Sequence, residues 1–105
     1  MKSKLLFLFL VLTQILSAQS FTEIPPAPEF DGVAFSSIAF SDVDGDGDKD
    51  VLITGVNSSG ERIAKLYTND GGTFTEVMGT PFDGVSNSSI AFSDVDGDGD
   101  KDVLI

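Results

Sequence analysis

The sequence predicts an all-β fold made of repeated antiparallel units, and three observations support this prediction. Residues 31–53 and 83–105 are identical at 21 of 23 positions, so the chain contains an internal repeat with an offset of 52 residues. Each repeat contains short apolar or alternating segments separated by Gly, Asn and Asp, which is typical of strands joined by turns. After the first 20 residues, no segment keeps a helical period over about 11 residues.

Four strands are expected in the complete repeat, residues 31–82. They are 36–41 (SSIAFS), 51–56 (VLITGV), 61–68 (ERIAKLYT) and 73–78 (TFTEVM). In the first strand, Ile38 and Phe40 fall on one face. The second strand begins as a continuous apolar run, as expected for a strand covered on both faces. Turns are expected at 57–60 (NSSG) and 69–72 (NDGG), because Asn, Asp and Gly tolerate positive φ.

Four short antiparallel strands in a repeat of about 50 residues are typical of a β-propeller blade. Residues 83–105 form a partial second repeat. The segment FTEI at 21–24 matches FTEV at 74–77, so residues 21–30 are expected to hold the final strand of a preceding unit and a linker. We expect this strand to pair with the last blade of a closed ring. Because a ring takes about four to eight blades, the sequence is interpreted as part of a longer protein with an incomplete propeller.

The first 20 residues have the pattern of a secretory signal peptide. Lys2 and Lys4 form a basic start, residues 5–12 are an unbroken apolar run, and small residues follow. The apolar run is too short to cross a bilayer, so no membrane span is expected once the signal is removed. The chain has no cysteine, which excludes a lipid-anchored lipoprotein and a disulfide framework. The sequence therefore predicts a secreted or cell-surface protein consisting of residues 21–105.

The negative charge of the chain is concentrated in two places. The net charge is −11, and removing the first 20 residues takes away two lysines and no acidic residue. Ten of the 17 acidic residues lie inside the segment DVDGDGDKD, which occurs at 42–50 and again at 94–102. No basic patch is present to neutralise phosphates, so nucleic acid is excluded as a partner.

The two acidic segments predict a cation-binding loop in each repeat. The carboxylates stand at alternate positions and are Asp42, Asp44, Asp46, Asp48 and Asp50 in the first loop and Asp94, Asp96, Asp98, Asp100 and Asp102 in the second. At the sixth position, Gly47 and Gly99 allow a sharp turn that directs the oxygens to one centre. Without a cation the curled loop suffers repulsion between like charges. Hard oxygen ligands without imidazole or thiolate indicate Ca²⁺ or Mg²⁺, and calcium is favoured because it accepts six to eight oxygens from a wrapped loop.

Two other kinds of calcium loop do not fit this pattern. An EF-hand needs a glutamate at position 12 and helices on both sides, whereas Ile53 and Ile105 stand at that position between expected strands. Thrombospondin-type arrays use cysteines and closely spaced loops. The sequence therefore predicts a calcium loop inside a β-hairpin, with about one Ca²⁺ in each loop.

The segments DVDGDGDKDVLI and LYTNDGGTFTEV resemble the FG-GAP/VCBS repeat family, whose blades form the integrin α-subunit propellers and occur in many secreted bacterial proteins. The resemblance covers residues 21–105. Neither FG nor GAP appears as such, which favours the VCBS-like branch. The resemblance implies a seven-bladed ring. It also implies that Ca²⁺ is bound by the side chains at loop positions 1, 3, 5 and 9 and by the carbonyl at position 7. These are Asp42, Asp44, Asp46, Asp50 and the carbonyl of Asp48, and Asp94, Asp96, Asp98, Asp102 and the carbonyl of Asp100. The side chains of Asp48 and Asp100 are expected to face solvent.

Two function classes are open at this point. The chain has no His and no Cys to activate a nucleophile or hold zinc, so it is not expected to be an enzyme. The first class is a secreted calcium-binding scaffold for adhesion or binding, with an extracellular protein or a glycan as its ligand. The alternative is the non-catalytic propeller portion of a secreted enzyme, such as a polysaccharide-degrading one, whose catalytic residues lie outside this sequence.

Overall fold

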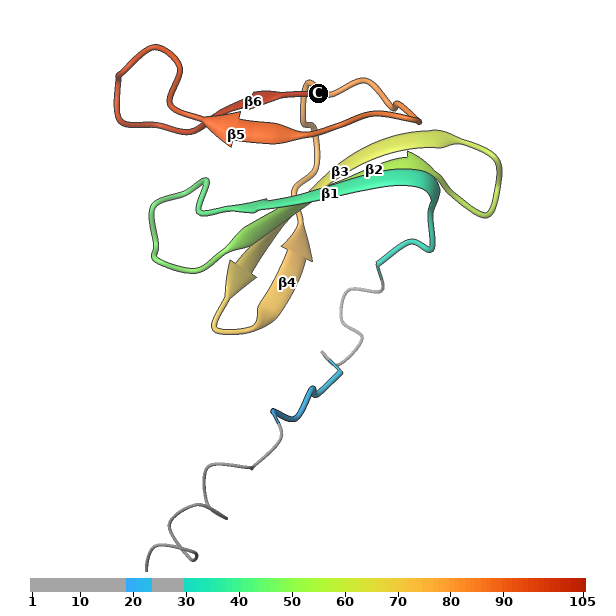
Figure 1. Ribbon diagram of the computed structural model, residues 1–105, viewed down its shortest axis with the longest axis horizontal. Coiled ribbons are helices and arrows are strands. Elements are labelled where there is room, and N and C mark those ends of the chain that lie inside the picture. Colours follow the sequence, from blue (N-terminus) through green and yellow to red (C-terminus); the bar gives the residue numbers. More distant parts are fainter. Residues whose placement is uncertain (1–18, 24–29) are drawn as a thin grey trace, which may run out of the picture.

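The computed structural model describes residues 19–23 and 30–105, and this part of the chain is all-β (Figure 1). A four-stranded antiparallel sheet has the order β1-β2-β3-β4, and a separate two-stranded sheet consists of β5 and β6. The strands are β1 (Ala34–Ser41), β2 (Asp50–Val56), β3 (Arg62–Asp70), β4 (Thr73–Glu76), β5 (Ala91–Ser93) and β6 (Asp102–Leu104). Most of the predicted signal peptide and the end of the predicted strand 21–24 lie outside the described residues.

All four strands predicted in the first repeat are present, with two differences at their ends. β3 continues to Asp70, because Asn69 and Asp70 pair with Phe74 and Thr73 of β4. The turn between these strands is therefore shorter than the predicted 69–72, and the unpaired residues are two glycines with positive φ. β4 ends at Glu76, two residues before the predicted end.

The other difference is a β-bulge at the start of β1. Ala34 pairs with Val56 and Ser37 pairs with Thr54, so two residues of β1 lie opposite Gly55 alone. The additional residue, Phe35, adopts a φ of 49°. Gly55 is required here, because a Cβ atom would lie 2.8 Å from the carbonyl oxygen of Ala34. The bulge adds two residues to the predicted strand.

The core of the larger sheet is aromatic and lies on β2, β3 and β4. Val51, Tyr67 and Phe74 are buried and pack together with Ile53. Phe30, which precedes β1, makes edge-to-face contacts with Tyr67 and Phe74 at centroid distances of 4.9 and 5.3 Å. Edge-to-face pairs of this kind stabilise a core beyond the area that they bury. β2 is buried along most of its length, as its continuous apolar run predicts.

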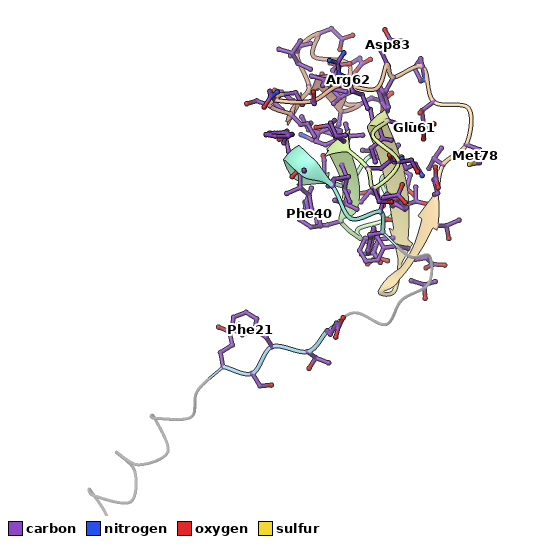
Figure 2. All side chains as sticks on the ribbon, turned by 90° about the vertical axis from the view of Figure 1, so that its right-hand side faces the viewer. Phe21, Phe40, Glu61, Arg62, Met78 and Asp83 are labelled. Atoms are coloured by element: carbon purple, nitrogen blue, oxygen red, sulfur yellow. The ribbon has the colours of Figure 1, made fainter. Side chains whose placement is uncertain are left out.

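The two faces of the larger sheet have different surroundings. One face carries an apolar cavity of about 310 Å³ that is lined by Phe30, Ile38, Phe40, Val51, Ile53 and Phe74. Ile38 and Phe40 remain 58% and 59% exposed on this face, and Phe40 projects from the sheet in Figure 2. Thr54 follows Ile53 in β2, so its side chain points to the opposite face. That opposite face is covered by the second repeat, and we call the two sides the cavity face and the covered face.

Contacts between the repeats lie on the covered face. The hydroxyls of Thr54 and Ser88 are 2.8 Å apart, and the Asn87 N–H donates to the Phe35 carbonyl at 2.9 Å. Val85 forms an isolated antiparallel bridge with Ile63 of β3. Figure 1 shows the β5–β6 hairpin stacked above β1. The repeats therefore pack as successive layers.

The described N-terminal residues stand apart from the sheets. Residues 19–23 form no strand, and Phe21 lies away from both sheets (Figure 2). The expected pairing of segment 21–24 with a last blade stays a prediction. Within the described ranges 19–23 and 30–105, no helix is long and apolar enough to cross a membrane.

Candidate metal centre

Each acidic loop connects the two strands of a hairpin. The first loop joins β1 to β2 and the second joins β5 to β6. Figure 1 shows both loops projecting from the same side of the molecule. In each loop the structure brings together three of the five predicted carboxylates, so that one oxygen from each lies within 4.8 Å of the others. These groups are Asp42, Asp44 and Asp50 in the first loop and Asp94, Asp96 and Asp102 in the second.

The carboxylate at the first position organises the loop around itself. Asp42 accepts hydrogen bonds from the N–H groups of Gly45 (2.8 Å), Asp46 (3.2 Å) and Gly47 (2.9 Å). Gly47 has a φ of 93°, a conformation that side chains other than that of glycine rarely adopt. Asp94 and Gly99 repeat this arrangement, with the last hydrogen bond again at 2.9 Å. The predicted role of glycine at the sixth position is therefore confirmed in both loops.

Asp46 and Asp98 lie outside the groups of three carboxylates. The Asp46 carboxylate accepts the Asp48 N–H at 2.9 Å, and Asp98 accepts the Asp100 N–H at the same distance. These carboxylates cap the turn that follows them. Their assignment as ligands stays a prediction from the family resemblance.

Asp48 and Asp100 differ although they occupy the same loop position. The Asp48 carboxylate accepts a hydrogen bond of 2.8 Å from the Gly71 N–H, in the turn between β3 and β4. The expectation that this side chain faces solvent is therefore wrong. Asp100 is exposed, as expected. The difference arises because a turn corresponding to that of Gly71 would lie beyond residue 105, outside the printed sequence.

Asp50 and Asp102, which close the loops, also differ in their surroundings. Asp50 is 0% exposed, and its two oxygens accept the N–H groups of Val43 and Asn69, each at 2.8 Å. Asp102 is partly buried and accepts the Val95 N–H at 2.8 Å. Both carboxylates are held by the backbone, and Asp50 is held more completely because β3 lies beside it.

The hydrogen bonds separate the pKa values of neighbouring carboxylates. The Gly47 N–H, with that of Gly45, lowers the pKa of Asp42. The Gly99 N–H has the same effect on the pKa of Asp94. The pKa of Asp44 is raised, first by local desolvation and then by the neighbouring charges of Asp46 and Asp50. The first-position carboxylates are thus held ionised, whereas Asp44 gains most from a nearby positive charge.

The size and chemistry of both groups fit a divalent cation. Calcium binds oxygens at about 2.3–2.6 Å, so two ligands on opposite sides of one ion lie about 4.6–5.2 Å apart. The 4.8 Å limit on the carboxylate oxygens matches this span. The donors are all hard oxygens, the type that calcium and magnesium prefer. Backbone donors hold two of the three carboxylates in place, so the residues present fit such an ion.

Sequence reasoning missed the part that Asn69 and Gly71 play at the first loop. Residues 69–72 were predicted as a turn, but nothing in the local pattern relates that turn to a loop about 20 residues earlier. The hydrogen bonds from Asn69 to Asp50 and from Gly71 to Asp48 depend on the pairing of β2 with β3. Only that long-range pairing brings the turn to the loop.

Comparison with known proteins gives one match. No curated protein and no solved structure matches the chain. The sequence profile described as FG-GAP-like repeat matches residues 42–105, a stretch that includes both acidic loops and all strands from β2 to β6. The match covers more than half of the chain and spans both repeats. The chain therefore belongs to the FG-GAP-like repeat family.

Proposed function

We propose that this chain is a calcium-binding β-propeller segment of a secreted or cell-surface protein, acting as a scaffold for binding or adhesion. The observation that carries the proposal is the pair of carboxylate groups at the same place in two stacked repeats. Repulsion within each group is relieved when a cation is bound, and the same carboxylates become its ligands. Calcium then ties the two strands of each hairpin together.

The propeller part of the proposal is supported by how the repeats pack. Ser88, Ile90 and Phe92 alternate along the second repeat, so they share one face. Because Ser88 contacts Thr54 on the covered face of the first repeat, that face of the second repeat points toward the first. Ile90 and Phe92 are correspondingly only partly exposed. The same relation applied repeatedly generates a head-to-tail array, and such an array closes into a ring when the rotation permits.

The cavity face supports the same proposal. Ile38 and Phe40 of the first repeat correspond to Ile90 and Phe92 of the second, yet they are largely exposed. A preceding blade of the same kind would cover them, as the first repeat covers their counterparts. We propose that the complete ring belongs to the VCBS-like branch of the family and presents its loops to an extracellular protein or glycan. We propose no catalytic role for the segment itself.

Calcium titration calorimetry tests the proposal. Asp44 and Asp96 are suitable positions, because each is exposed and its carboxylate accepts only a long hydrogen bond (3.3 and 3.2 Å) within the loop. The parent chain should show two saturable sites, Asp44→Asn or Asp96→Asn should each leave one, and the double variant should leave none. Asp83→Asn makes the same charge change outside both loops and should keep two sites. Equal binding by the parent and the double variant would contradict the calcium assignment.

A further inference from the structure

The turn between β3 and β4, residues 69–72, is fastened to the first acidic loop; we call it the clamp turn. The Asn69 N–H donates to Asp50 at 2.8 Å, and the Asn69 side-chain amide donates to the Lys49 carbonyl at 3.0 Å. The Gly71 N–H donates to Asp48 at 2.8 Å. Within the turn, the Asn69 side-chain oxygen accepts the Gly72 N–H at 2.8 Å. Three consecutive residues at the end of the loop are thereby held from outside it.

We propose that the clamp turn is a positioning element of the first cation site, with Asn69 as its positioning residue. This inference rests on the proposed function, since it concerns how tightly the loop binds calcium. It has two consequences. The first loop binds calcium more tightly than the second, although their sequences are identical. Calcium binding in turn stabilises the clamp turn, which supplies no carboxylate to the groups of three.

The difference between Asp50 and Asp102 carries the first consequence. Both oxygens of Asp50 have a backbone donor, and one of these donors belongs to Asn69. The hydrogen bond to Asp102 comes from Val95 of its own loop. A carboxylate fixed from two sides loses less conformational freedom when it binds an ion, so its affinity is higher. Removing such outer partners typically lowers metal affinity by about 10- to 100-fold.

Asn69 is suited to this role because each of its polar groups has a separate partner. Its N–H positions Asp50, its side-chain amide holds the Lys49 carbonyl, and its side-chain oxygen shapes the turn through the Gly72 N–H. That shape directs the Gly71 N–H toward Asp48. A substitution of Asn69 therefore alters the backbone on both sides of Lys49 without removing any carboxylate.

The test measures each loop alone in the full-length chain. The Asp96→Asn background leaves only the first loop able to bind, and the Asp44→Asn background leaves only the second. Titration with Ca²⁺ against a competing chelator should give a dissociation constant about tenfold lower for the first loop. Adding Asn69→Ala should raise the dissociation constant of the first loop about tenfold and leave that of the second loop unchanged. Asn69→Asp keeps the acceptor for Gly72 and should recover part of the affinity.

Asp48→Ala and Asp100→Ala form a matched pair for the second contact. Both remove one negative charge at the seventh position and keep the backbone carbonyl, but only Asp48 accepts a hydrogen bond from the clamp turn. Asp48→Ala should therefore weaken the first loop more than Asp100→Ala weakens the second. A merely structural role of Asn69 would not change the ratio of the two affinities.

Amide hydrogen exchange provides a readout that is independent of affinity. Because coupling between two sites is reciprocal, calcium should slow exchange at the Asn69 and Gly71 amides. Equal affinities of the two loops, or an Asn69→Ala variant that leaves the first loop unchanged, would overturn the inference and leave the proposed function standing. Absence of calcium binding in every background would overturn both.

Discussion

At the scale of single residues, the same side chain performs different tasks according to the backbone around it. Asp42 gathers three backbone N–H groups and has a lowered pKa, whereas Asp44 has few donors and a raised pKa. Asp48 holds a distant turn through Gly71. Alternation of the acidic residues therefore does not make them equivalent, because each faces a different set of donors.

The pKa values of Lys65 and Tyr67 predict loss of stability at alkaline pH. The Lys65 ammonium lies 2.7 Å from Asp31 and 3.6 Å from Glu76, and the bond to Asp31 raises its pKa above 10.5. Burial raises the pKa of Tyr67 above 10.0. Groups with raised pKa values contribute stability that is complete below their unfolded-state values and is lost as pH rises through the folded-state values. The free energy of unfolding should therefore fall above about pH 10.

Urea unfolding at a series of pH values from 8 to 11.5 checks this prediction (~0.5 pH unit steps resolve the slope). Tyr67→Phe removes one of the two titrations, and its stability should fall less steeply above about pH 10. Asp31→Asn should reduce the contribution of Lys65 in the same range. A free energy of unfolding that stays constant up to pH 11 in the parent chain would contradict the prediction (~11 lies above both unfolded-state pKa values).

At the scale of elements, the β-bulge shows how one repeat position is solved in two ways. Phe35 and Asn87 occupy equivalent positions, and both have positive φ, 49° and 52°. This left-handed conformation costs most residues about 1–2 kcal/mol, but Asn adopts it more readily. Phe35 is 68% exposed and therefore gains little from packing. The first repeat thus carries backbone strain that the second repeat avoids.

Exchanging these residues tests the strain. Phe35→Asn should increase the free energy of unfolding by about 0.5–1 kcal/mol, because Asn relieves the strain and little packing is lost. Asn87→Phe should lower it by a similar amount. Urea unfolding followed by circular dichroism measures both changes. A destabilised Phe35→Asn variant would show that the exposed aromatic ring contributes more than the strain costs.

At the scale of the whole molecule, the repeats form layers that contact each other closely. Gly84 lies against β3, where a Cβ atom would overlap the Arg62 carbonyl group. The equivalent Gly32 in the first repeat has no atom within 4 Å of the same position. Glycine is thus required only where one repeat meets another in the described part of the chain.

This contrast predicts different effects of the same substitution in the two repeats. Gly84→Ala should destabilise the chain by about 1–3 kcal/mol, because the second repeat must shift away from β3. Gly32→Ala should change the free energy of unfolding by less than about 0.5 kcal/mol. Both variants can be compared by urea unfolding. Equal effects of the two substitutions would contradict the packing of the repeats described here.

Much of the fold is predictable from short stretches of sequence. The strand at 51–56, the turn glycines and the loop glycine at position 6 follow from local patterns of apolar residues and from the φ values that glycine allows. The bulge at Phe35 was not predicted, because a Phe in a strand-like segment gives no local signal for positive φ.

The sequence by itself determined the all-β repeat, the order of the strands along the chain and the hard-oxygen chemistry of both loops, because these depend on residue type and spacing within one segment. Only the tertiary structure decided which three carboxylates converge, that Asn69 and Gly71 hold the first loop, and which face of the sheet is covered. These features arise from contacts between residues about 20 or more positions apart, such as Asn69 with Asp50 and Thr54 with Ser88. Two loops of identical sequence therefore differ, since the strand that supports one of them comes from elsewhere in the chain.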